Sequence, residues 1–283
     1  MDKSFTLIEI LVVIVVIGIL SSFIVVGISS IISEANDAKG KAFLNSLKNN
    51  LLLNIVAEWK FDGPSSAGSD ASDADVLDTW LSNDGGVGIH QPTVRSGSDC
   101  VSGNCLEFNG VSDYVAVPYT GAFNFGLKLG VFVWVRGLPQ TDDKKIIAHY
   151  DYGSTNRSWS IGIDDNTFNK LEVIISNDGS NGNPHLKQYY TSDIILDNKW
   201  HNVGFTWNGG VEESGGTLKL YIDGKEASVV IVRDDAWVDY ALHDANGINL
   251  TIGSCLNNGN TNPAYLFNGF IDDIRIFNDV PSF

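Results

Sequence analysis

The hydrophobic and polar positions divide the chain into two parts with different periodicities. Residues 10–33 contain no charged side chain, and apolar residues at helical spacing follow them: Phe43, Leu44, Leu47, Leu51 and Ile55. The 24 uncharged residues would form roughly 36 Å of helix, enough to cross a bilayer core of about 30 Å. The pattern therefore predicts one helix over residues 5–56. Its first part, residues 5–33, is apolar enough to span a membrane, and its outer part carries a stripe that can dock on a globular domain.

From residue 57 onward the period changes, and the chain consists of short apolar or alternating runs separated by Gly, Asn, Asp and Ser. Runs such as GVFVWVRG, LEVIIS, LKLYIDG and FIDDIRIF are typical of β-strands, and about a dozen of them occur with no helical stretch between. This pattern predicts an all-β sandwich or jelly roll over residues 57–283. Alternating residues such as Leu218 and Leu220, or Val203 and Phe205, are expected to fill the space between its sheets.

Charge and cysteine content narrow the classes of partner and compartment. The formal net charge is -16, from 34 acidic and 18 basic residues, so nucleic acid is not an expected partner. Cys100 and Cys105 flank the turn sequence Val-Ser-Gly-Asn. In an exported domain these two cysteines are predicted to form a disulfide across a tight hairpin. Cys255 is left over and is expected to be buried.

One carboxylate, Glu9, stands at the start of the apolar segment. An ionised group near hydrocarbon is costly, so it is expected to be functional and to have a partner. The phrase Phe5-Thr-Leu-Ile-Glu9 closely resembles the processing and assembly signature of type IV prepilins and pseudopilins. The alternatives are a secretory signal peptide, whose apolar core is shorter, and a plain signal anchor, which would not explain Glu9.

The resemblance to prepilins implies a processing route and a set of partners. A prepilin peptidase would remove the leader, residues 1–4, by cutting between Ser4 and Phe5, and the new amino group of Phe5 would be methylated. Glu9 would then pair with the amine of a neighbouring subunit. The subunit would sit in the bacterial cytoplasmic membrane before assembly and in an extracellular filament afterwards. Ser4 departs from the family, in which Gly is usual before the cut.

Four segments of the second part resemble the laminin-G-like jelly rolls of the concanavalin A-like lectin and glucanase superfamily, in order and in spacing. They are residues 105–115 (CLEFNGVSDYV), 200–206 (WHNVGFT), 220–225 (LYIDGK) and 269–276 (GFIDDIRI). The resemblance covers about residues 57–278, nearly the whole exported part. It implies a lectin-like head with a glycan or another surface ligand as a possible partner.

The sequence offers no pair of carboxylates arranged for glycoside hydrolysis. No Glu is followed by Asp two positions later, as in laminarinase-type relatives, and Glu172 is the only Glu in the middle of a clear strand. No catalytic residues are therefore predicted. Jelly rolls of this type often hold one structural calcium ion, and the matching positions are Asp78, Asn83 and Asp272 or Asp273. The alternative is that these residues only form turns.

Together these features predict a structural subunit of an extracellular type IV pilus-like filament that displays a lectin-like head for adhesion. One alternative is a pseudopilin of a secretion or DNA-uptake machine, in which the head is a spacer. Another is a membrane-anchored carbohydrate-binding protein that does not polymerise. A third is a degenerate glycoside hydrolase.

Overall fold

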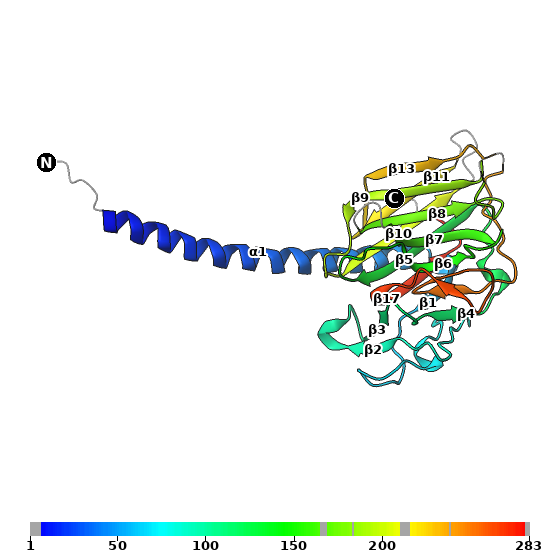
Figure 1. Ribbon diagram of the computed structural model, residues 1–283, viewed down its shortest axis with the longest axis horizontal. Coiled ribbons are helices and arrows are strands. Elements are labelled where there is room, and N and C mark those ends of the chain that lie inside the picture. The colour runs from blue at the N-terminus through cyan, green and yellow to red at the C-terminus, as the bar shows by residue number, and fades with distance from the viewer. Residues whose placement is uncertain (1–6, 165–168, 183, 210–215, 238, 281–283) are drawn as a thin grey trace.

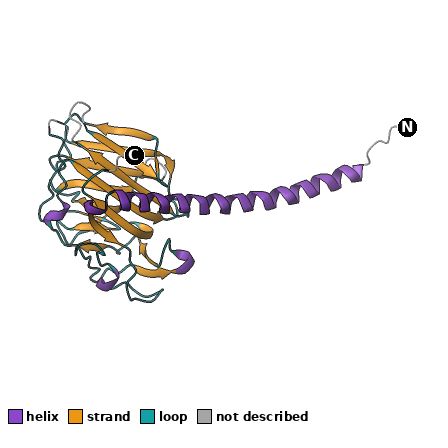
Figure 2. Cartoon of the chain, turned by 180° about the vertical axis from the view of Figure 1, so that it is seen from behind, coloured by secondary structure: helices purple, strands orange, loops and turns teal. Residues whose placement is uncertain are grey.

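The computed structural model describes residues 7–164, 169–182, 184–209, 216–237 and 239–280, without the side chains of residues 18–33 and 37. Helix α1, Leu7–Asn50, projects from one side of an all-β head (Figures 1 and 2). Four short 3-10 helices lie in the head: η1 Leu52–Asn54, η2 Asp73–Asp75, η3 Gly97–Asp99 and η4 Gly121–Phe123.

The head is a sandwich of two antiparallel sheets, which confirms the predicted all-β jelly-roll class. The first sheet has the order β12-β11-β10-β5-β17-β3-β2, with β1 also paired to β17. Its strands are β1 Ile55–Trp59, β2 Thr93–Ser96, β3 Asn104–Asn109, β5 Lys128–Arg136, β10 His201–Asn208, β11 Thr217–Ile222, β12 Lys225–Glu226 and β17 Asn268–Phe277.

The second sheet has the order β13-β9-β8-β7-β6-β14-β4. Its strands are β4 Val115–Val117, β6 Lys144–Tyr150, β7 Arg157–Ile163, β8 Lys170–Ser176, β9 Leu186–Ile194, β13 Val229–Asp234 and β14 Leu250–Ile252. A separate two-stranded ribbon pairs β15 Cys255–Leu256 with β16 Pro263–Ala264.

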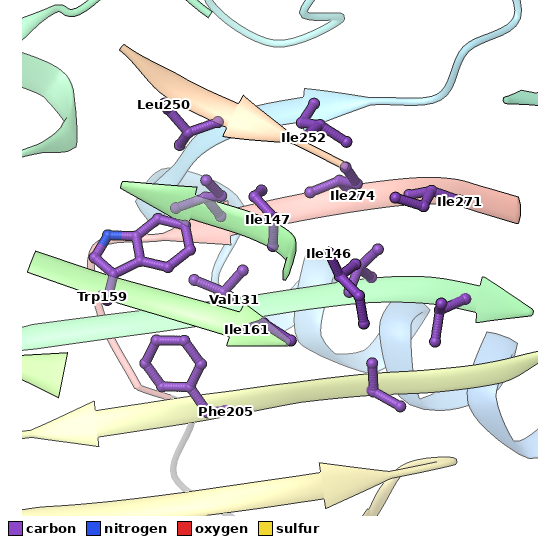
Figure 3. Packing of buried hydrophobic residues seen from close by; sticks show 14 of the residues in the cluster. Val131, Ile146, Ile147, Trp159, Ile161, Phe205, Leu250, Ile252, Ile271 and Ile274 are labelled. Atoms are coloured by element: carbon purple, nitrogen blue, oxygen red, sulfur yellow. The ribbon is translucent and has the colours of Figure 1, made fainter. Parts of the chain in front are cut away.

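The main core lies between the two sheets. Val131 of β5 is in register with Phe205 of β10 and with Ile276 of β17, and all three are fully buried. From the facing sheet, the Trp159 ring meets the Phe205 ring at a centroid distance of 6.1 Å (Figure 3). Leu218, Leu220 and Val203 also belong to this core, as predicted.

A second core lies on the outer face of the first sheet, where the C-terminal part of α1 packs. Side chains alternate across a strand, so Val131, Val133 and Val135 of β5 face the sandwich while Phe132 and Trp134 face the helix. The helix contributes Leu44, Leu47 and Leu51 to this second core. The predicted stripe therefore does dock on the head. Trp200 also belongs to this second core.

The helix ends earlier than predicted. Asn50 is its last residue, and Ile55 and Val56, predicted to be helical, open β1. β1 pairs antiparallel with β17, with Ala57 opposite Ile276 and Trp59 opposite Ile274. The apolar residues of β1 are buried by this pairing, and the β-branched pair Ile55-Val56 suits a strand better than a helix. The tertiary pairing thus decides the boundary.

At Gly40 the backbone of α1 approaches the sheet closely. A Cβ at this position would lie 2.6 Å from Cη2 of Trp134 and 3.3 Å from Cβ of Asn202. Trp134 is fully buried and has little room to move. Glycine in a helix costs about 1 kcal/mol of stability relative to alanine. Here its lack of a side chain allows the helix to approach Trp134 closely.

We expect Gly40→Ala to destabilise the docked helix although alanine is the better helix former. Overpacking costs about 1–3 kcal/mol and the gain in helix propensity is about 1 kcal/mol, so the net loss should be about 1 kcal/mol. Urea unfolding of a chain that begins at Glu34 measures it. Ser46→Ala, at an exposed position of the same helix, is the control and should not destabilise. A more stable Gly40→Ala variant would show that the contact with Trp134 is not restrictive.

Candidate functional site

Of the predicted processing and assembly residues, the structure describes Glu9, near the start of α1. Ser4 and Phe5 fall outside the described residues, and Glu9 is exposed in the first turn of the helix. Its apolar neighbours are also exposed, from Leu7 at 84% to Ile17 at 56%. In the described part of the chain, no helix is both long enough and apolar enough to cross a membrane. The side chains of residues 18–33, most of the predicted span, lie outside that part.

A disulfide joins Cys100 and Cys105, with their Cα atoms 5.4 Å apart, and confirms the predicted pairing. The loop that it closes is attached on two sides. Lys41 Nζ of α1 donates to the carbonyl of Val101 at 2.9 Å. The N–H groups of Val101 and Ser102 donate to Oδ2 of Asp272 in β17, at 3.0 and 3.2 Å. The disulfide loop therefore ties the helix to the last strand of the sandwich.

A buried group of charged side chains completes the junction between the helix and the head. Glu58 of β1 accepts hydrogen bonds from Arg275 Nε at 2.9 Å, from Lys48 Nζ at 3.1 Å and from Thr79 Oγ1 at 2.8 Å. Burial alone would raise the pKa of Glu58, but the hydrogen bonds from Thr79 and Lys48 and the charge of Arg275 lower it overall. Glu58 is thus held as an anion at the contact between α1, β1 and β17.

Sequence reasoning did not find this group, although a signal for it was present. Glu58 and Arg275 are charged residues inside two otherwise largely apolar strand segments, AEWKF and FIDDIRIF. A charge in a buried strand needs a partner of opposite sign. That the two strands are neighbours could not be read from residues so far apart in the sequence.

The structure brings two of the three predicted calcium ligands together. Asn83 Nδ2 donates to Asp78 Oδ2 at 3.1 Å, and Asp78 also accepts from the backbone N–H groups of Glu58, Trp80 and Asn83. Asp272 instead accepts from the disulfide loop. Among the described residues, no group of three or more His, Cys, Asp or Glu is placed to hold a metal ion. A calcium site here stays a prediction, which thermal melting with and without a chelator would test.

Two groups that could serve acid–base chemistry are held in buried structural contacts. Glu172, the mid-strand Glu of β8, pairs with Lys145 of β6 and accepts a hydrogen bond from Gln188 of β9 at 2.7 Å. Burial lowers the pKa of His149 to about 4, and its Nε2 lies 3.3 Å from the carbonyl oxygen of Ile248. Glu172 is thus held in an ion pair inside the sheet, and the lowered pKa keeps His149 neutral near pH 7.

Comparison with protein families identifies both parts of the chain. The model of the concanavalin A-like lectin/glucanases superfamily matches residues 109–282, more than half of the sequence. The chain therefore belongs to this superfamily. The model of the prokaryotic N-terminal methylation motif, which marks type IV pilins, matches residues 1–25. A search of curated proteins found no match.

Solved structures with a similar fold include binding domains of bacterial toxins. The binding domain of Paraclostridial Mosquitocidal Protein 1 has a TM-score of 0.52 at 16% identity, covering 81% of this chain and 50% of that one. The binding domain of botulinum neurotoxin DC, solved with rat synaptotagmin II, has a TM-score of 0.52 at 16% identity, covering 82% and 50%. A structure of botulinum neurotoxin type C has a TM-score of 0.50 at 17% identity, covering 83% and 50%. The chain thus spans about half the length of these structures, and they share its fold.

Asp272 should make the stability of the head depend on pH. Burial, helped by the neighbouring charge of Asp273, raises the pKa of the Asp272 carboxyl to about 8, whereas an unfolded Asp titrates near 3.9. Between about pH 4 and pH 8 the folded state therefore keeps a proton on Asp272 that the unfolded state has released. Its stability falls as pH rises from about 4 to 8, by at most about 1.4 kcal/mol per pH unit.

Asp272→Asn removes this titration, and its side-chain oxygen can still accept from Val101 and Ser102. The variant should therefore gain stability over the wild type as pH rises from 5 to 8. Urea unfolding at both pH values measures the gain. Parallel pH dependence of the two proteins would contradict the raised pKa.

The buried pair of Lys145 and Glu172 should be structural. Lys145→Met leaves the Glu172 carboxylate buried without its cation and should cost about 3–5 kcal/mol of unfolding free energy. Adding Glu172→Leu removes that charge, so the double variant should be more stable than Lys145→Met alone. Chemical denaturation of the two single variants and the double variant tests this coupling. A double variant no more stable than Lys145→Met would mean that the charge pair is not the reason for the loss.

Proposed function

We propose that this chain is the structural subunit of an extracellular type IV pilus-like filament that presents a lectin-like head for adhesion. The observation that carries the proposal is the division of α1 into two regions. Its C-terminal region is buried on the head through Leu44 and Leu47, whereas its first turns, residues 7–17, are exposed and, apart from Glu9, apolar. Exposed apolar surface of this extent calls for a second contact, with lipid or with other helices.

The processing route follows the methylation motif. The precursor sits in the cytoplasmic membrane of a bacterium, where a prepilin peptidase cuts between Ser4 and Phe5 and the Phe5 amine is methylated. Identical or related subunits then bury the apolar helices against one another in the filament core. Glu9 pairs with the amine of a neighbouring subunit, which offsets the cost of burying its charge.

The head is a binding module and not an enzyme. It belongs to a superfamily of lectins and glucanases, but Glu172 is paired with Lys145 inside the sheet. Among the proteins of similar fold, botulinum neurotoxin type C depends on interaction with two ganglioside molecules for cell entry. Gangliosides are glycolipids, so that toxin binds a glycan-bearing surface, and this chain matches half of the length of its structure. A glycan on a surface is therefore the partner class that we propose for this head.

Glu9→Ala should reduce filament yield strongly while leaving membrane insertion intact. Removing a charge makes the segment more apolar, so insertion should be preserved. Quantifying the chain in sheared surface material and in the membrane fraction separates the two effects. Glu34→Ala, a second exposed carboxylate on the same helix, is the control and should assemble normally. Equal filament yield from Glu9→Ala and the wild type would refute the assembly role.

Two further measurements separate the proposed function from its alternatives. Mass analysis of the surface form should find a mature chain that begins at a methylated Phe5. A glycan array probed with sheared filaments should show binding to defined glycans. Filaments without glycan binding would favour a pseudopilin whose head is a spacer. Glycan binding without filaments would favour an anchored carbohydrate-binding protein.

A further inference from the structure

A cavity of about 270 Å³ lies at the junction between α1 and the head. Water occupies about 30 Å³ per molecule in the liquid, so the cavity has room for several waters or for one small organic ligand. Its walls come from the helix, the segment after β1, the disulfide loop and β17. They include Lys41, Asn45, Lys60, Asp62, Ser102 and Asp273.

Two residues that line this cavity are buried and not fully satisfied. Asp272 is 1% exposed and Arg275 is 6% exposed. In the described part of the chain, Asp272 Oδ1 and Arg275 Nη1 have no hydrogen-bond partner, and neither does Oδ1 of the neighbouring Asp273. Such orphaned polar atoms are costly and rare in native proteins. Three of them at one cavity leave hydrogen bonds for water or a bound ligand to supply.

The charges around the cavity indicate what kind of ligand this is. Three cationic side chains, Lys41, Lys60 and Arg275, face three carboxyl groups, those of Asp62, Asp272 and Asp273. An anionic ligand would be repelled by the carboxylates, and a cationic ligand would be repelled by the ammonium and guanidinium groups. A hydroxyl both donates and accepts, so a neutral ligand with several hydroxyls can satisfy the orphaned carboxyl oxygens and the orphaned guanidinium N–H together.

The backbone beside the cavity is held in an unusual conformation. Asp273 has φ of 40° and Phe61, next to Asp62, has φ of 60°, both in the left-handed region. Non-glycine residues seldom adopt these angles, and such strain concentrates at ligand sites. Here the surrounding strands hold Asp62 and Asp273 at the cavity wall at the cost of that strain.

We propose that this cavity binds a single neutral sugar unit, so that the glycan site of the head lies under the helix. This proposal rests on the proposed function of the head and specifies where on the head the glycan binds. Because Lys41 and Asn45 belong to α1, the helix forms one wall of the site. A sugar bound there contacts both parts of the chain.

The test titrates single sugars into the full chain and compares two variants of one helix. The probes are glucose, galactose, mannose and N-acetylglucosamine, and the protein is kept in a zwitterionic detergent that carries no sugar. Binding is measured by ligand-observed NMR. Asn45→Trp places a large side chain at the mouth of the cavity. Asn49→Trp, one turn further along and also exposed, lies outside the cavity lining and is the matched control.

A third variant tests the hydrogen bond to the ligand and leaves the volume of the cavity nearly unchanged. Asp273→Asn keeps an oxygen that can accept from Arg275, whose Nη2 lies 3.0 Å from Asp273 Oδ2. It replaces the orphaned acceptor with a donor, and asparagine tolerates the left-handed backbone. We expect at least one sugar to bind the wild type and Asn49→Trp equally, to lose binding to Asn45→Trp, and to bind Asp273→Asn about tenfold or more weakly.

Two outcomes would overturn the assignment of the sugar site to this cavity. They differ in whether the glycan-binding function of the head is also rejected. Sugar binding that is unchanged in both Asn45→Trp and Asp273→Asn would place the sugar elsewhere and leave the lectin-like function standing. No binding of any probe to the wild type, together with a blank glycan array, would reject both the cavity and the glycan-binding head. Filament yield is independent of either result.

Discussion

The structure depends on strand β5 being buried on both of its faces. Its valines fill the space between the two sheets, and Phe132 and Trp134 form the floor on which α1 rests. Phe43 of the helix meets Phe132 edge-on at 5.4 Å between ring centroids. Each fully buried leucine of the helix stripe contributes about 1.5–3 kcal/mol relative to exposure. Because one strand supports both cores, the docking of the helix and the packing of the sandwich stabilise each other.

An apolar stripe alone would allow the helix to slide or rotate, and the charged group at the junction limits that freedom. Lys48 reaches Glu58 only when the helix stands in one register, and Glu58 is fixed by Arg275 on the neighbouring strand. A buried ion pair is often a weak source of stability because its partners lose their hydration. Its contribution here is specificity, as it defines which turn of the helix faces which strand. The bond from Lys41 to the disulfide loop fixes a second point.

The sequence was sufficient for the parts of the fold that follow from local periodicity. The alternation in LKLYIDG and GVFVWVRG predicted buried strands, and the stripe from Phe43 to Leu51 predicted a docked helix. The turn between Cys100 and Cys105 predicted the disulfide. What could not be predicted depends on long-range pairing. The end of the helix at Asn50 follows from the pairing of β1 with β17, and the role of Gly40 follows from Trp134 lying opposite it.

The same limit applies to the candidate site. Asp272 and Asp273 were recognised as possible ligands because they match the calcium positions of similar jelly rolls. Arg275, the partner of Asp273, lies two residues away on the same strand, but Val101 and Ser102, the partners of Asp272, come from a loop whose proximity no spacing rule gives. Asp78 and Asn83 were placed together correctly, because they belong to one short turn sequence.

The junction also determines how the two halves of the molecule act on each other. In the proposed filament the apolar turns from Leu7 to Ile17 are fixed by neighbouring helices, and the head is fixed to the same helix by Leu44, Leu47 and Lys48. The position of each head is then set by helix packing and not by a flexible linker. A contact that alters the fit of α1 on β5 would therefore act on the same continuous helix that packs in the proposed filament core. This follows from the absence of a linker between α1 and β1 within the described chain, where only a short 3-10 turn, Leu52–Asn54, separates them.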